Sequence, residues 1–211
     1  MSNTNWVTID CELEYCKLFE DDRDMGNEHV NLDKFDGVYR VTCIMDDENK
    51  EKLIKAGIPQ DHALLKKEIE TFMKDNNLDD YDLAEVKYGK TKEGEKLINK
   101  VRYQQEFKQT EDGRWKFSFK RPHFNPNLAG TINPKTGVEN DGVMGPPRVT
   151  DFEATQDAKE FIMWNPEVKI GNGSKGKVKV SVYKGRGTTI TLEAVAVTEH
   201  VEYVGGEMEL V

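Results

Sequence analysis

The chain has 211 residues, with 39 acidic and 30 basic side chains and a net charge of −9 at pH 7. A chain of this length can bury one sizeable hydrophobic core, so we expect one domain with appendages. No apolar run approaches the ~18 residues needed to cross a bilayer and the N-terminal residues lack the pattern of a signal peptide, which excludes a membrane or secreted class and predicts a cytosolic protein.

The cysteines Cys11, Cys16 and Cys43 form neither an even set nor a paired CxxC motif. A disulfide scaffold and a zinc knuckle are therefore both disfavoured, and we expect reduced thiols.

Negative charge is concentrated at the N-terminus. Residues 1–50 carry 13 acidic and 5 basic side chains, whereas residues 101–150 carry 8 basic and 5 acidic ones. The segment 173–192 has five basic residues and no acidic residue. Because a polyanion responds to the charge within a Debye length of ~8–10 Å, the negative net charge does not exclude a nucleic-acid partner.

The first elements differ in their apolar spacing. Residues 1–36 are acid-rich with few regularly spaced apolar residues, which predicts a solvated arm or long loop. The alternating, β-branched segment 37–46 predicts the first long strand. Apolar residues at helical spacing then predict a helical insertion over about 47–86, in which Pro59 suits a helix start.

From residue 99 onward the pattern has a period of two. Residues 99–108 and 113–121 alternate on either side of an Asp112-Gly113 turn, which predicts a hairpin. Residues 122–147 hold five of the seven prolines, so we expect a long loop of the kind that often serves function. Residues 168–185 and 188–204 predict a second long hairpin. About five strands with one helical insertion favour a small, highly curved β-barrel over a parallel α/β sheet.

Alternation divides the strand at 175–184 into two faces. Its valines form a core face, while Lys175, Lys177, Lys179 and Tyr183 share the outer face. Cations interleaved with an outward aromatic ring suit a platform for single-stranded nucleic acid, because phosphates bind cations and unpaired bases stack on rings. A solvated lysine row that protects a sheet edge is the competing interpretation.

Other basic strands and one aromatic residue are weaker candidates. Arg114, Lys116 and Lys120 point away from an apolar face that we assign to the core, and Arg102 and Lys108 share one face of 101–108. Phe124 stands where the strand enters the proline-rich loop and could close over a base or plug the end of the barrel; both readings stay open.

Signatures of catalysis and of metal binding do not emerge. The run GNGSKGK lacks the spacing of a P-loop and precedes a strand pattern, so its glycines are expected to make a bend or bulge. The four histidines are scattered, no calcium-loop or nucleophile-elbow pattern occurs, and the acidic pairs lie in polar segments. We therefore expect a binding protein without enzymatic activity, metal or cofactor.

Three segments resemble the single-stranded DNA-binding proteins of tailed bacteriophages: GRWKFSFKRP, GPPRVTD and the run IGNGSKGKVKVSVYKGRGTTITLEAVAVTEHVEYV, which together cover about residues 99–205. The resemblance implies a mainly β OB-fold, a five-stranded Greek-key barrel with a helical insertion and long loops, over residues 37–204. The acidic segment 1–36 would precede it and a short tail, 205–211, would follow.

The resemblance also implies a role. It implies sequence-tolerant binding of single-stranded DNA during phage DNA replication, recombination and repair in the cytoplasm of the infected bacterial cell. Phage replication proteins are expected as further partners, and a homodimer is left open. Several members of the family end in a long acidic tail that competes with DNA; because this chain ends in only EHVEYVGGEMELV, the N-terminal acid is the candidate competitor here.

The predicted DNA-binding residues lie on these strands and on the loops beside them. They are Arg102, Lys108, Arg114, Lys116, Lys120, Arg121, Phe124, Arg148, Lys175, Lys177, Lys179, Tyr183, Lys184 and Arg186. The alternative function is an RNA-binding or protein-interaction OB module, and a metal-dependent nuclease that uses the acidic pairs is the least favoured reading.

Overall fold

The computed structural model describes residues 4–27, 30–58, 74, 107–133, 136–156, 158, 160–184 and 188–203. The chain divides into two compact units, one made of Met1–Ile58 and Lys108–Val211 and the other of Pro59–Phe107. Nearly all of the second unit lies outside the described residues, and with it most of the predicted helical insertion and residues 99–106 of the strand predicted over 99–108. The predicted tail 205–211 also lies outside them.

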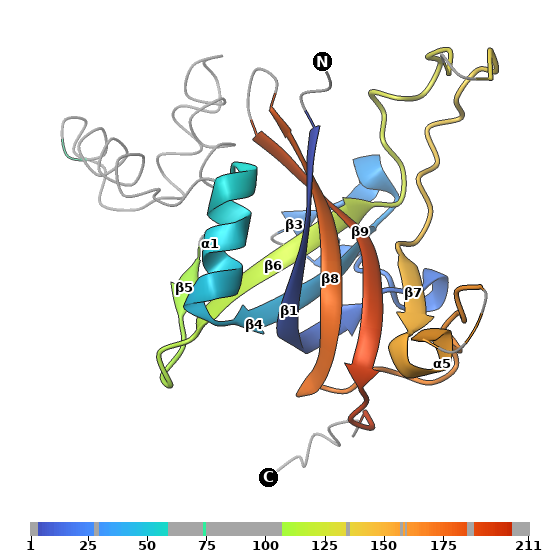
Figure 1. The fold of residues 1–211 in the computed structure, drawn as a ribbon. Helices are drawn as coiled ribbons and strands as arrows, with labels where there is room; N and C mark the ends of the chain where they lie inside the picture. Colours follow the sequence, from blue (N-terminus) through green and yellow to red (C-terminus); the bar gives the residue numbers. More distant parts are fainter. Residues whose placement is uncertain are drawn as a thin grey trace, which may run out of the picture. The chain divides into compact units, whose positions relative to one another are not determined.

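Seven strands of the first unit form one sheet in the order β5-β6-β4-β1-β8-β9-β7 (Figure 1). Their bounds are β1 (Thr4–Lys17), β4 (Val38–Met45), β5 (Lys108–Gln109), β6 (Trp115–Pro122), β7 (Arg148–Asp151), β8 (Ser174–Lys184) and β9 (Thr188–Glu199). Two short strands, β2 (Gly26–Asn27) and β3 (Val30–Asn31), pair separately. The helical elements are η1 (Glu20–Asp22), η2 (Asp33–Phe35), α1 (Asp47–Ala56) and α5 (Phe152–Gln156).

The pairing of the five long strands is that of an OB-fold. β1, β4 and β6 form an antiparallel meander, and β8 and β9 form a hairpin whose first strand pairs back onto β1. β9 then lies next to β6, where the Arg121 guanidinium donates to the carbonyl oxygen of Leu192 at 3.4 Å. This is the order of a partly open Greek-key barrel. The predicted fold class is therefore confirmed, although the sheet has seven strands rather than five and side chains rather than a strand ladder connect β6 to β9.

The prediction of a solvated arm over residues 1–36 is wrong for its first half. Thr4–Lys17 is the longest described strand and lies in the middle of the sheet, so this segment is part of the domain that was predicted to begin at residue 37. Ile9, Cys11 and Leu13 are buried at alternate positions, which is the period of a strand. The acidic residues between them point to the opposite face, where cations of neighbouring strands neutralise them, and this acid content resembles that of a solvated segment.

The core lies on the inward face of the sheet and is mostly aliphatic. Phe117 and Phe119 of β6 pack with ring centroids 5.0 Å apart, and the three valines of β8 are fully buried, as the alternation predicts. Cys11 and Cys43 are buried thiols of this core, and all three cysteines are free. Burial raises the pKa of the Cys43 thiol, so it packs as a small apolar group.

The helix α1 confirms the start of the predicted insertion and is tied to the edge of β1. Asp46 caps it by accepting a hydrogen bond from the Asn49 amide at 2.8 Å, and Gly57 ends it with φ 113°. The Asn49 side chain accepts from the Asp10 amide at 3.2 Å, where β1 has no strand partner on that side. Among the described residues, no helix is long and apolar enough to cross a membrane.

The predicted hairpin and long loop are both present. Gly113 has φ +86° in the turn between β5 and β6, and the Thr110 amide donates to the Arg114 carbonyl across it at 2.9 Å. The loop after β6 is held by its own backbone bonds, such as Asn125 N to the Gly142 carbonyl at 2.8 Å. Phe124 packs against Gly142, where an added Cβ would lie 2.5 Å from its ring, so Phe124 helps to hold this loop.

Candidate nucleic-acid interface

The face of the sheet opposite the core, the outer face, carries the candidate interface. Residues directly opposite each other in neighbouring strands share a face. Thr8 of β1 lies opposite Lys179 of β8, Lys179 opposite Ala194 of β9, and Ala194 opposite Arg148 of β7. One row of outward side chains therefore crosses four strands, and it brings together Lys179 and Arg148, two of the predicted DNA-binding residues.

Exposed aromatic rings flank the two cations of this row. The Lys179 ammonium lies 5.0 Å from the centroid of the Trp6 ring, and the Arg148 guanidinium lies 5.2 Å from that of Phe161. Trp6 is 58% exposed, Phe161 64% and Tyr183, which lies diagonally across from Trp6, 49%. We call Trp6, Lys179, Tyr183, Arg148 and Phe161 the basic–aromatic band. Neither cation forms an ion pair with a carboxylate of the described residues.

The other predicted lysines of β8 are neutralised. Lys177 forms an ion pair with Asp10 of β1, and Lys175 pairs with Glu199 of β9 at 2.9 Å. Both carboxylates project from strands that flank β8. Two of the three lysines predicted to bind phosphate on this strand are therefore already paired with a carboxylate. Lys179 is the member of the row that keeps its charge uncompensated within the described residues.

The basic residues around β6 are neutralised in the same way. Arg114 pairs with Glu12 at 2.7 Å, and Lys116 pairs with Glu14 at 2.6 Å. The acidic stretch that the sequence assigned to a loop thus supplies counter-charges to the sheet from alternate positions of β1. A phosphate that binds Arg114 or Lys116 has to compete with a carboxylate already in place.

Arg121 has a structural position. Its guanidinium, 15% exposed, donates to the backbone carbonyls of Met144 and Gly145 at 2.8 and 2.9 Å and pairs with Glu193 at 2.9 Å. Glu193 also accepts from the Ser181 hydroxyl at 2.6 Å. Arg121 therefore joins β6, β9 and the long loop, and its donors are used inside the protein.

The remaining predicted residues are spread over other surfaces. Lys120 lies beside Arg40, and desolvation together with that neighbouring cation lowers the pKa of Lys120. Lys108 is exposed on β5, and Lys184 is exposed at the end of β8 beside Gly57. Phe124 belongs to the long loop, as described above. Arg102 and Arg186 lie outside the described residues.

The glycine-rich IGNGS segment before β8 is a tight junction rather than a phosphate loop. The Gly171 amide donates to the Val201 carbonyl at 2.9 Å, and an added Cβ at Gly171 would lie 2.6 Å from the Glu202 carbonyl oxygen. The Ser174 hydroxyl donates to the Gly171 carbonyl, and the Asn172 side chain accepts from the Tyr15 amide at 2.8 Å. The segment thus fixes the ends of β1 and β9 around the start of β8.

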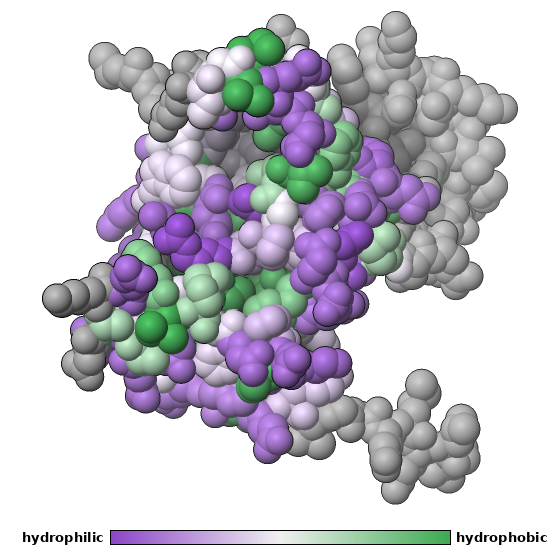
Figure 2. Space-filling view, turned by 90° about the vertical axis from the view of Figure 1, so that its right-hand side faces the viewer, coloured by the Kyte–Doolittle hydropathy of each residue, from purple (hydrophilic) through white to green (hydrophobic). Residues whose placement is uncertain are grey.

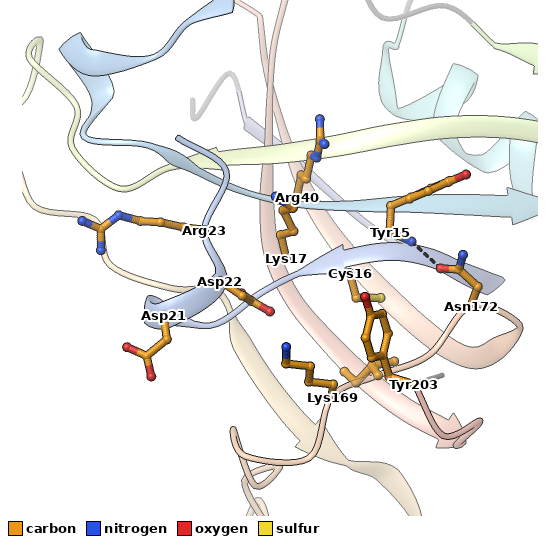
Figure 3. Close-up of a pocket in the computed structure, with 11 residues that line it drawn as sticks. Tyr15, Cys16, Lys17, Asp21, Asp22, Arg23, Arg40, Lys169, Asn172 and Tyr203 are labelled. Carbon is orange, nitrogen blue, oxygen red and sulfur yellow. Dashed lines mark hydrogen bonds between the residues drawn. The ribbon is translucent and has the colours of Figure 1, made fainter. Parts of the chain in front are cut away.

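A pocket of about 590 Å³ opens beside this junction (Figure 3). Tyr15 and Lys17 of β1 line it together with Asp22, Lys169 and Tyr203. Tyr15 lies at an irregularity of the β1–β4 pairing, where its backbone is left-handed with φ 49°. Its side chain is 58% exposed. None of these five residues was predicted, because they come from three separate parts of the sequence and belong to segments interpreted as loops or strand ends.

The side of the molecule formed by β7 and α5 is mainly hydrophilic, with small apolar groups between the charged side chains (Figure 2). Phe161, Ile162 and Met163 are exposed apolar residues of the connection between α5 and β8. Within the described part of the chain, no group of three or more histidine, cysteine, aspartate or glutamate side chains is arranged to hold a metal ion.

Comparisons with known proteins find solved structures that are similar to this chain. No protein-family model matches the chain, and no curated protein sequence matches it. A single-stranded DNA-binding protein from bacteriophage Enc34 in complex with single-stranded DNA is 14% identical, with 97% of this chain and 95% of that chain covered and a TM-score of 0.40. A C-terminal truncation of the same phage protein is 13% identical, with 97% and 94% covered and a TM-score of 0.39.

Proposed function

We propose that the protein binds single-stranded DNA without sequence specificity and without catalysis. The observation that carries this proposal is the basic–aromatic band, in which Trp6, Tyr183 and Phe161 present exposed rings around two cations that pair with no carboxylate of the described residues. The resemblance of residues 99–205 to phage proteins supports a role in DNA replication, recombination and repair in the cytoplasm of an infected bacterial cell.

The band suits single strands because of what it can contact. Unpaired bases expose their π-faces, and stacking on a protein ring contributes about 1–3 kcal/mol per base. In a duplex those faces are covered by neighbouring base pairs. Since every base has a π-face, rings such as Trp6 and Phe161 bind bases of any sequence, which accounts for the proposed lack of specificity.

Phosphates would bind between the rings. Lys179 and Arg148 stand two strands apart, which is about 10 Å at a strand spacing of ~4.8 Å. Ala194 lies between them on β9, and its short side chain leaves the two cations unobstructed. A backbone that crosses β9 can therefore meet both cations while its bases reach the rings at either side.

Because several cations are paired with carboxylates, we expect phosphate contacts to contribute little to the affinity for DNA. Each phosphate contact on a single strand contributes about −0.7 to the slope of log K against log salt. With Lys179 and Arg148 as the main contacts, we expect a slope of roughly −1 to −2, which is shallow for a protein that coats DNA.

The test is a titration of fluorescently labelled oligo(dT), of the matching RNA and of a duplex with the same label, each at two salt concentrations. Tighter binding of the single strand and a shallow negative salt slope would support the proposal. Equal affinity for duplex and single strand, or tighter binding of the matching RNA, would contradict it.

A further inference from the structure

The pocket beside the IGNGS junction has a chemical character different from that of the band. Its lining includes four cations and two carboxylates, but the guanidinium groups of Arg23 and Arg40 point away from it (Figure 3). Arg23 is paired with Asp36 and Arg40 with Asp24. Their aliphatic parts form part of the pocket wall, and the remaining cations of the lining are two lysines.

Lys17 and Lys169 supply these cations. Neither forms an ion pair with a carboxylate of the described residues, and both lie close enough to Asp22 to lower the pKa of its carboxyl group. Lys169 also lies over the Tyr203 ring, with its ammonium 5.4 Å from the ring centroid. In Figure 3 the Lys169 side chain points towards Asp22, whereas the Lys17 side chain extends towards Arg40, its partner in the β1–β4 pairing. Lys169 is therefore the cation that lies beside the aromatic ring.

Asp22 supplies a single acceptor inside the same pocket. Its Oδ1 accepts from the Phe19 amide at 2.9 Å, and its other oxygen has no partner among the described residues. Desolvation by burial raises the pKa of this carboxyl, an effect that Asp21 reinforces and that the Phe19 amide and the two lysines oppose. In Figure 3 the carboxylate points into the pocket from η1.

Inorganic phosphate alone does not explain this combination. A volume of about 590 Å³ falls within the range of small-molecule sites and far exceeds one phosphate, and a carboxylate would repel a lone anion. The Lys169 ammonium for an anion, a half-exposed Tyr203 ring for stacking and one carboxylate acceptor together match a nucleotide. The Asn172 amide, whose oxygen is held by the Tyr15 amide, adds a polar donor at the rim.

We infer that this pocket binds one nucleotide, with its phosphate on Lys169, its base against Tyr203 and an amino group of that base donating to Asp22. The inference rests on the proposed function insofar as the nucleotide is a unit of the bound strand. A free nucleotide presents the same chemistry, so the test has to separate the two sources.

The acceptor at Asp22 makes the site selective among bases. A carboxylate accepts from the exocyclic amino group of cytosine, whereas thymine presents a carbonyl oxygen at the corresponding position. The pocket therefore prefers cytosine to thymine at this one nucleotide, whereas the rings of the band stack on any base. In Asp22→Asn, the side-chain oxygen can keep the Phe19 amide while the new amide NH2 faces the pocket, which should move the preference towards thymine.

Calorimetric titration of the full chain with dCMP, dTMP and inorganic phosphate tests the inference. Because a good base contact contributes about tenfold in discrimination, we expect dCMP to bind about tenfold more tightly than dTMP, with phosphate weakest. Lys169→Met should weaken the binding of dCMP about tenfold. Lys55→Met, which removes the same charge from an exposed position on α1, should change nothing. Thermal unfolding of each variant confirms that it is folded.

The outcomes separate this inference from the proposed function. If dCMP does not bind, or if dCMP and dTMP bind equally and Asp22→Asn leaves that ratio unchanged, the inference is overturned whatever oligo(dT) does. If dCMP binds as expected but oligo(dT) does not bind, the pocket is a free-nucleotide site and the proposed function fails. If Lys169→Met weakens dCMP and oligo(dC) together, the nucleotide is a unit of the bound strand.

Discussion

The Lys179 ammonium lies 5.0 Å from the centroid of the exposed Trp6 ring, and no described carboxylate pairs with it. Lys175, on the same face of the same strand, is instead paired with Glu199. Both lysines lie on the outer face of β8, but only Lys179 has an ammonium group that no described carboxylate already pairs with.

Lys179→Met should weaken oligo(dT) binding about fivefold and make the salt slope shallower by about 0.7, because one phosphate contact is lost. Lys175→Met is the matched control and should change affinity less than twofold. The two variants are compared by fluorescence anisotropy at two salt concentrations. An equal loss in both variants would mean that the whole lysine row, rather than the band, binds DNA.

Removing acid from β1 should have the opposite effect. Asp10→Asn frees Lys177 and Glu14→Gln frees Lys116, so the double variant should bind oligo(dT) several-fold more tightly at low salt. Deletion of residues 10–36 cannot test this, because it removes most of β1.

The control for that variant is Glu48→Gln, which removes one negative charge from an exposed pair with Lys52 on α1. It should leave DNA affinity nearly unchanged. Equal tightening in the control would assign the effect to net charge, and unchanged affinity in the double variant would show that the carboxylates do not compete with DNA.

Arg121 and Arg148 should show opposite phenotypes. Arg121→Ala removes the links to Met144, Gly145 and Glu193 and leaves Glu193 uncompensated, which should lower the free energy of unfolding by about 3 kcal/mol. Arg148→Ala, at an exposed position, should change stability by less than about 0.5 kcal/mol but weaken DNA binding. Urea unfolding and oligo(dT) titration of both variants check this; normal stability of Arg121→Ala would contradict the structural role.

The cap of α1 should contribute stability that depends on pH. The Asn49 amide lowers the pKa of Asp46, and a depressed carboxyl pKa stabilises the fold above the ordinary value of 3.8 and ceases to do so as pH falls through the lowered value. Asp46→Ala should therefore cost about 1 kcal/mol at neutral pH, with the difference from the parent shrinking below about pH 4. A difference independent of pH, measured by urea unfolding, would exclude a charged cap.

Much of the fold follows from local pattern. The valines of β8 and the phenylalanines of β6 alternate with charged residues, and both predicted core faces are buried as expected. The same alternation places Arg121 on the side of Phe119, so its inward position was readable from the sequence. The resemblance to phage proteins, rather than the period, led to its assignment as a DNA-binding residue.

The missed parts depend on contacts between distant residues. Asp10 and Lys177 are 167 positions apart, and their pairing follows from the register of β1 on β8, which no local pattern reveals. When the register is unknown, the acidic residues of β1 resemble those of a solvated arm. For the same reason the sequence does not indicate that Trp6 lies on the sheet. Phe161 was missed because an irregular connection, rather than a strand, carries it to Arg148.

The central claim is that the rings of the basic–aromatic band stack on unpaired bases, and the affinity of the Trp6→Leu/Phe161→Leu double variant for oligo(dT) tests it most directly. Both rings are exposed, so thermal unfolding should be nearly unchanged, while the loss of two stacking contacts should weaken binding by at least about tenfold. Unchanged affinity in a variant that unfolds normally would contradict the claim.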